Sequence, residues 1–128
     1  MTTTDRPVEV EVPARVEYVR LVRMVVASLA GSRRDLDGDR VDDLRLAVSE
    51  ACVLAVTDGE AARLLVSCRE EPDSFIVDVH DGPREGDIDD QLAFALIRAL
   101  VDEVTTVEED GGTRLRLRVR CAPVSTTL

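Results

Sequence analysis

Glu50 is the residue whose type and position most suggest chemistry in this sequence. It is the one acid in the middle of an apolar run, 42–56, whose three- and four-residue spacing predicts a helix. An ionisable side chain in such a run either belongs to a functional site or lies on the solvent side of the helix. Because buried acids are rare, the periodicity alone favours the solvent side.

The sequence also predicts the helices and strands that precede and follow this helix and must position it. Before it, 8–12 alternates valine with glutamate and predicts a short strand. Residues 15–30 predict a helix with its apolar stripe at Val16, Val19, Val22, Val25, Val26 and Leu29. Asp37 and Asp39 can cap the start of the central helix, because an aspartate side chain accepts hydrogen bonds from free backbone N–H groups.

After the central helix, the segments 63–70 and 74–80 predict two strands, joined by a turn that contains proline and aspartate. Residues 91–104 predict a third helix, and 104–108 and 113–120 predict a closing hairpin. The inner face that we expect for the third helix consists of Leu92, Ala95, Leu96, Ala99 and Leu100.

This order of elements predicts an α+β two-layer sandwich, with three main helices on one face of a mixed, mostly antiparallel sheet. A chain of 128 residues is long enough for one hydrophobic core. We therefore expect a single domain at 7–121, with flexible tails at 1–6 and 122–128.

Charge and composition exclude several classes of function. The net charge of −10 repels phosphate backbones, so we expect no direct nucleic-acid binding, and a partner with a basic surface fits better. No apolar run is long enough to span a membrane, and the N-terminal residues lack a signal pattern, so we expect a cytoplasmic protein. Three widely spaced cysteines provide no metal motif, and we expect no metal site of that kind: Cys52, Cys68 and Cys121.

A row of arginines marks the last predicted strand. Arg114, Arg116, Arg118 and Arg120 alternate with apolar residues and must share one face of that strand. The simpler interpretation is a solvated sheet face paired with acids on a neighbouring strand, such as Glu108. The alternative is a docking surface for an acidic partner or for a second subunit. His80 is the only histidine and has no nucleophile motif nearby, so we expect no catalytic role for it.

Several stretches together resemble one bacterial family. The central "DLRLAVSEAC", followed by "VLAV", resembles the signature helix of the RsbW/SpoIIAB anti-sigma factor serine kinases, within the histidine-kinase and heat-shock-chaperone ATPase superfamily. "VPARVEYVRLVRMVV" resembles the opening strand and helix of the family. "ALIRALVDEV" and "GGTRLRLRV" resemble its closing helix and hairpin. The resemblance covers about Val8 to Arg120 and implies a histidine-kinase-like ATPase fold.

The resemblance implies roles for particular residues. Glu50 falls on the family's general base. The magnesium-binding asparagine of the family is replaced by Leu54, and the whole chain contains no asparagine. Asp81 falls on the aspartate that contacts adenine, followed by Gly82, with an acidic surface turn as the alternative interpretation. The glycines of the second glycine box are replaced by Gln91 and Ala93, whose side chains should crowd the phosphates.

These departures lead to an expectation about function. The resemblance implies a transcription regulator of the stress-response type, an anti-sigma factor that sequesters a sigma factor, is relieved by an anti-anti-sigma (STAS-type) protein and forms a homodimer. The altered nucleotide motifs favour action without kinase activity or a cofactor. The alternative is an active serine kinase that uses Glu50, ATP and magnesium to phosphorylate its antagonist. A third possibility is an adaptor that binds another STAS-type protein outside sigma-factor control.

Overall fold

A computed structural model gives the structure of residues 6–58, 62–80, 91–109 and 112–121. Apart from Arg6, the predicted tails lie outside this described part of the chain. In chain order the elements are β1 (Val8–Pro13), a 3-10 turn η1 (Val16–Tyr18), α1 (Val19–Gly31), α2 (Gly38–Asp58), β2 (Arg63–Glu71), β3 (Ser74–His80), α3 (Gln91–Leu100), β4 (Glu103–Glu109) and β5 (Gly112–Arg120).

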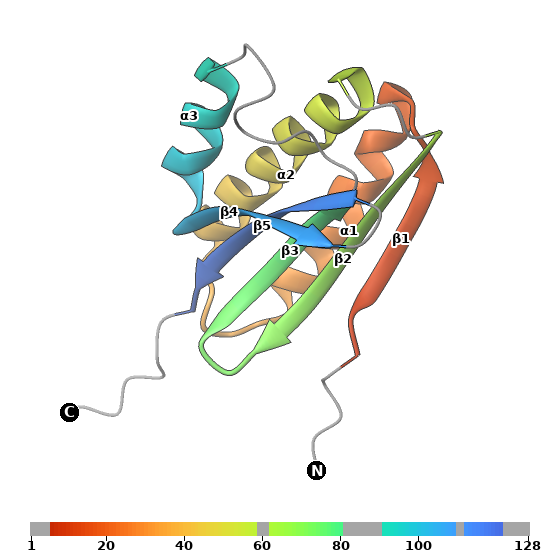
Figure 1. Cartoon of the computed structure of the whole chain (residues 1–128). Helices are drawn as coiled ribbons and strands as arrows, with labels where there is room; N and C mark the ends of the chain where they lie inside the picture. Colours follow the sequence, from red (N-terminus) through yellow and green to blue (C-terminus); the bar gives the residue numbers. More distant parts are fainter. Residues whose placement is uncertain (1–5, 59–61, 81–90, 110–111, 122–128) are drawn as a thin grey trace, which may run out of the picture.

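The strands form one five-stranded sheet in the order β1-β2-β3-β5-β4. The helices α1, α2 and α3 all lie on the same face of this sheet, with α2 between the other two (Figure 1). The predicted α+β two-layer sandwich is therefore confirmed. In one detail the sheet differs from the expectation, because every pair of neighbouring strands that the structure describes is antiparallel and the sheet is not mixed.

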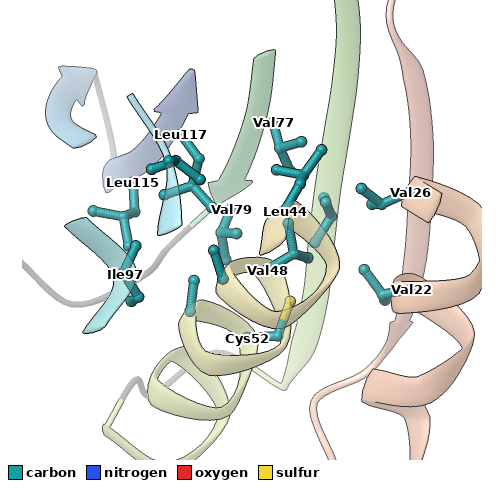
Figure 2. Close-up of a cluster of buried hydrophobic side chains, with 14 of the residues drawn as sticks. Val22, Val26, Leu44, Val48, Cys52, Val77, Val79, Ile97, Leu115 and Leu117 are labelled. Atoms are coloured by element: carbon teal, nitrogen blue, oxygen red, sulfur yellow. The ribbon is translucent and has the colours of Figure 1, made fainter. Parts of the chain in front are cut away.

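The hydrophobic core fills the space between the helices and the sheet. Figure 2 shows Val77 and Val79 of β3 and Leu117 of β5 among the core side chains around α2. Alternate residues of a strand point to opposite faces, so each strand contributes every second side chain to this core. Phe75 and Phe94 are buried in it, Tyr18 packs against it while partly exposed, and aliphatic side chains do most of the packing.

The start of α2 is fixed by one of the two predicted caps. The backbone N–H of Arg40 donates to Oδ1 of Asp37 at 2.8 Å, which satisfies a donor that no helical carbonyl can reach. Asp39 lies inside the helix, whose first residue is Gly38, and so it is not the cap. The direction of α2, and with it the position of Glu50, follows from this start.

Arg33 holds the connection between α1 and α2 against the turn between β2 and β3. Its guanidinium donates to the backbone oxygens of Glu71 at 2.8 Å and of Ser74 and Pro72 at 3.2 Å each. It also forms two hydrogen bonds with Asp35, both at 2.9 Å, and these bonds hold the pKa of the Asp35 carboxyl below its ordinary value. The entry of α2 is thereby tied to the sheet.

The predicted face of α1 is confirmed apart from Val16, since Val19, Val22 and Val26 are buried and Leu29 packs against the core. The predicted face of α3 is wrong apart from Leu100, which packs against the core. Val16 lies in η1, before α1 begins, and its side chain is 53% exposed. In α3 the buried side chains are Ala93, Phe94 and Ile97, while Leu92 is 80% exposed and Ala95, Leu96 and Ala99 are also exposed. The reason is that α3 is apolar around nearly its whole circumference, so its spacing was compatible with two opposite inner faces. The helix also ends at Leu100 rather than Val104, because β4 begins at Glu103.

None of the helices in the described part of the chain is long and apolar enough to cross a membrane.

Candidate functional site

The central helix buries the apolar face that its sequence predicted. Leu44, Ala47, Val48, Ala51, Leu54 and Ala55 of α2 are all at most 8% exposed. Glu50 lies at the margin of this face and is half-buried. Its carboxylate forms no hydrogen bond or ion pair with another residue in the described ranges. The side chain is thus neither fully solvated nor used to hold the fold together, which leaves it available for a ligand or a substrate.

One turn further along α2, Leu54 occupies the position at which the resemblance calls for a magnesium ligand. Its side chain is 5% exposed and packs in the core cluster. Magnesium requires oxygen ligands in octahedral geometry, and a hydrocarbon side chain offers none. This part of α2 therefore does not fit a magnesium ion, and no group of three or more His, Cys, Asp or Glu side chains elsewhere in the described ranges could hold a metal.

The two predicted nucleotide contacts, Asp81 and Gly82, lie outside the described residues. The second glycine box is described in part. Ala93 is 8% exposed and belongs to the core cluster, so its methyl group packs inward. The side chain at position 91 lies outside the description as well. Of the predicted nucleotide site, the structure therefore describes the part on α2 and Ala93 of α3.

A cavity of about 490 Å³ opens at the beginning of α2, away from Glu50. Its lining includes Asp37, Arg40, Asp73, Arg120 and Cys121. Glu50 is the twelfth residue after Gly38 along the helix, which corresponds to about 18 Å at the rise of an α-helix. The cavity is therefore distinct from the position that the family motif assigns to chemistry.

The predicted arginine row is confirmed as a surface of ion pairs on the face of the sheet opposite the helices. Arg116 binds both oxygens of Asp78 on β3, with Nε at 2.8 Å and Nη2 at 3.0 Å, and Arg114 adds a third contact at 3.0 Å. Asp78 is only 2% exposed, so its charge is compensated inside a region with little water. The sequence analysis missed Asp78, because its pairing depends on the register between β3 and β5.

Arg118 extends this network to both sides. It contacts Glu71 on β2 and Glu103 on β4, each at 3.2 Å. Burial alone would raise the pKa of Glu71, but hydrogen bonds from Arg118 and Arg69 outweigh it and hold that pKa below its ordinary value. Arg114, Arg116 and Arg118 are therefore paired with acids of the same chain.

His80 also lies on this face and contacts Ser67. The Oγ of Ser67 lies 2.9 Å from Nε2 of His80, and Glu9 lies 3.4 Å from the same hydroxyl. Ser67 is buried at 7% exposure beneath its neighbours. His80, Ser67 and Glu9 therefore form a part-buried hydrogen-bond network across β1, β2 and β3.

A different surface stands out on α1. Leu21 is 45% and Met24 63% exposed, one helical turn apart. Arg20 and Arg23 flank them, and neither has an ion pair with another described residue. We call Arg20, Leu21, Arg23 and Met24 the α1 surface. It combines solvent-exposed apolar side chains with uncompensated positive charge, on a protein with a net charge of −10.

The sequence is similar to a family of known proteins. Residues 12–119 match the family described as Histidine kinase-like ATPase domain. The Bacillus subtilis "Serine-protein kinase RsbW" is 34% identical over an alignment 130 residues long, and the match covers 83% of this chain and 81% of that protein. The Mycobacterium tuberculosis "Anti-sigma-F factor RsbW" is 34% identical over an alignment 111 residues long, and the match covers 81% of this chain but only 63% of the relative.

A solved structure has the same fold. The crystal structure of the RsbU and RsbW domains of a Mycobacterium tuberculosis protein superimposes with a TM-score of 0.70 at 23% sequence identity. The match covers 95% of this chain and 34% of the solved one. Sequence and fold agree with the resemblance read from the motifs. The chain belongs to the histidine kinase-like ATPase domain family, in its RsbW group of anti-sigma factors and serine-protein kinases.

Proposed function

We propose that this protein is an anti-sigma factor that sequesters a sigma factor and is released by an anti-anti-sigma protein of the STAS type, without ATP-dependent kinase activity. The observation that carries the binding function is the α1 surface. Exposed Leu21 and Met24 offer apolar contact area, and Arg20 and Arg23 offer charges that no described neighbour neutralises. Apolar anchors with arginine beside them are typical of the energetic centre of a protein interface.

The charge of the α1 surface indicates the kind of partner. The chain as a whole is acidic, and α1 has no acidic residue, whereas the start of α2 exposes Asp39 and Asp42. A partner that binds α1 should present carboxylates around an apolar centre, because arginine pairs with carboxylates in a bidentate geometry. An acidic segment of a sigma factor or of its antagonist would meet this requirement. Two partners that compete for the same surface would explain release without phosphorylation.

The proposed loss of kinase activity rests on α2. Leu54 replaces a metal ligand with a buried hydrocarbon side chain, and no asparagine elsewhere in the chain can take over its role. Phosphoryl transfer depends almost entirely on positioning and on neutralising charge, and a metal ion supplies much of that neutralisation. Without the ligand on α2, we expect neither tight nucleotide binding nor efficient transfer.

Serine kinase activity is the second candidate, and it has support of its own. The Bacillus subtilis relative bears the name serine-protein kinase. Glu50 is retained, half-buried, and free of ion pairs with the other described residues, as a general base would have to be. The names of the Bacillus relatives thus favour the kinase, whereas the residues of α2 favour its loss.

Binding experiments test the first candidate. Purified sigma factors from the same genome serve as probes, and their affinity is measured by fluorescence anisotropy. Arg20→Glu and Met24→Glu should each weaken binding at least tenfold. The matched controls are Arg45→Glu on α2 and Leu92→Glu on α3, which are also exposed and should leave the affinity unchanged. Equal effects of all four variants, or no binding to any sigma factor, would contradict the proposal.

Kinase assays separate the two candidates. The protein is incubated with magnesium, labelled ATP and a purified anti-anti-sigma protein from the same genome. The first candidate predicts no transfer of phosphate to the protein substrate. Transfer that disappears in Glu50→Gln, with unchanged thermal stability of that variant, would establish the kinase. Sigma-factor binding is measured without nucleotide, so the two results are independent.

A further inference from the structure

The cavity at the beginning of α2 has no part in the proposed function. Its volume of about 490 Å³ is of the size that small-molecule sites have. Residues of three segments line it, namely the connection into α2, the turn between β2 and β3, and the end of β5, and these segments meet at one end of the sheet (Figure 1). The backbone N–H of Cys121 donates to the backbone oxygen of Asp73 at 2.8 Å, so the last two segments are joined directly.

The cavity combines an apolar side with charged groups. Leu36 and Cys121 line it and are only 7% and 4% exposed, so a ligand that enters can contact side chains of the core. Five charged residues of the described chain also line it: Asp35, Asp37, Arg40, Asp73 and Arg120. In a typical small-molecule site, apolar contacts supply most of the buried area and a few polar groups fix the orientation of the ligand.

Two of the five charges are compensated by partners that do not line the cavity. Asp35 forms a salt bridge with Arg33 at 2.9 Å, and Arg40 pairs with Asp102. Arg40 still has a donor to offer, because its Nε is buried and has no hydrogen-bond partner in the described part of the chain. Buried donors in folded proteins nearly always have an acceptor, so this nitrogen indicates an acceptor that comes from outside the chain.

The other three charged side chains are exposed and form no ion pair with another described residue: Asp37, Asp73 and Arg120. Asp37 accepts the hydrogen bond that caps α2 through Oδ1. Asp73 accepts a hydrogen bond from the hydroxyl of Ser74 at 3.3 Å. The cavity thus has one positive and two negative groups without a charged partner. A complementary ligand carries one anionic and two cationic groups.

We propose that this cavity binds a free basic amino acid, of the class of arginine and lysine. Such a molecule has one carboxylate, one α-ammonium group and one cationic side chain, and it matches the three unpaired charges in number and sign. Arg120 and the Nε of Arg40 can hold its carboxylate, because guanidinium donors form strong hydrogen bonds with carboxylates. Asp37 and Asp73 can hold its two cationic groups. Its methylene groups would lie against the apolar side of the cavity.

This assignment goes beyond the proposed function and does not depend on it, since neither a sigma factor nor a nucleotide takes part in the contact. Neither Glu50 nor the residues of the α1 surface line the cavity. A ligand that binds only the folded chain stabilises it, because the equilibrium shifts away from the unfolded state. Binding should therefore also raise the melting temperature of the protein.

Isothermal titration of the whole chain with L-arginine tests the site. Three analogues each lack one of the charged groups: agmatine lacks the carboxylate, N-acetyl-L-arginine the α-ammonium group, and L-citrulline the charge of the side chain. Each should bind at least tenfold more weakly, since each loses a charge-assisted hydrogen bond. Agmatine that binds as tightly as L-arginine would reveal a general attraction of cations to an acidic protein and overturn the proposal. A dissociation constant of L-arginine above about 10 mM would also overturn it.

Variants with matched controls locate the binding. Arg120→Ala and Asp73→Asn should each weaken the binding of L-arginine at least tenfold, and both side chains are exposed, so the fold should persist. The controls Arg45→Ala and Asp42→Asn make the same changes at exposed positions of α2 that do not line the cavity, and they should leave the dissociation constant unchanged. Thermal unfolding shows that each variant is folded. Equal weakening in all four variants would indicate a general effect of charge and overturn the proposal.

Discussion

Arg116 of β5 holds the carboxylate of Asp78 with two hydrogen bonds, from Nε at 2.8 Å and from Nη2 at 3.0 Å. The two side chains are cross-strand neighbours on the face of the sheet opposite the helices, and Arg114 adds a third contact from the same strand. An acid that is only 2% exposed on this face is an unusual arrangement, and it leads directly to a measurable consequence.

Asp78→Ala should destabilise the fold strongly. It removes a carboxylate that two partly buried arginines contact, and breaking a buried ion pair from one side typically costs about 3 kcal/mol or more. Urea unfolding at one fixed protein concentration measures the change. The control is Glu11→Ala, which breaks the exposed pair with Arg63 and should cost at most about 0.5 kcal/mol. Similar losses in both variants would show that burial of Asp78 is unimportant.

Leu54→Asn should also reduce stability, although it introduces the residue that the family motif would have there. Leu54 is 5% exposed and packs in the core, so the variant loses apolar contacts and buries an amide that needs hydrogen bonds. The expected loss is about 3 kcal/mol, against less than about 1.5 kcal/mol for Leu54→Met. Thermal and urea unfolding of the two variants make the comparison. An unchanged free energy of unfolding in Leu54→Asn would mean that position 54 tolerates a polar side chain.

Acid should destabilise the protein partly through Asp102. Burial alone would raise the pKa of this carboxyl, but a hydrogen bond from the backbone N–H of Arg120 at 2.6 Å and the contact with Arg40 hold it below its ordinary value of 3.8. A carboxyl whose pKa is lower in the folded state contributes stability above the unfolded value and loses it as the pH falls through the folded one. In Asp102→Asn, the melting temperature should therefore fall less steeply below about pH 4 than in the wild type. If the melting temperatures of the wild type and of Asp102→Asn fell equally steeply with pH, the Asp102 carboxylate would not contribute to acid destabilisation.

The thiols of the core should be inert in the folded protein. Burial raises the pKa of Cys52 and of Cys68 to about 12 each, from an ordinary value of 9.0. At pH 8 this lowers the thiolate fraction by about a thousandfold. A thiol reagent should therefore react slowly with the native protein and rapidly once guanidinium unfolds it. Fast reaction of the native chain would reveal local opening around α2 or β2.

The sequence predicted a helix or strand well where one of its faces is apolar and the opposite face is polar. The apolar face of α2 and the hairpin of β2 and β3 follow from periodicity and turn residues, and both are confirmed. The inner face of α3 could not be predicted, because Leu92 and Phe94 are equally apolar and only packing decides between them. The pairing of Asp78 with Arg116 depends on strand order and register, which single-sequence patterns do not determine.

For the candidate site, the sequence predicted which residues occupy the positions of the family motif, but not how buried those residues are. Glu50 and Leu54 were located on α2 by the spacing of the signature helix, and the structure adds that one is half-buried and the other packed in the core. The α1 surface was missed, because Leu21 and Met24 look like ordinary members of an apolar helix. Their exposure becomes visible only when the packing of α1 against α2 is known.

The α1 surface and the ion pairs of Asp78 lie on opposite sides of the sheet (Figure 1). A partner that binds α1 therefore leaves the contacts of Asp78 in place. Substitutions at the two places should change affinity and stability independently, because distant sites without shared contacts have additive effects.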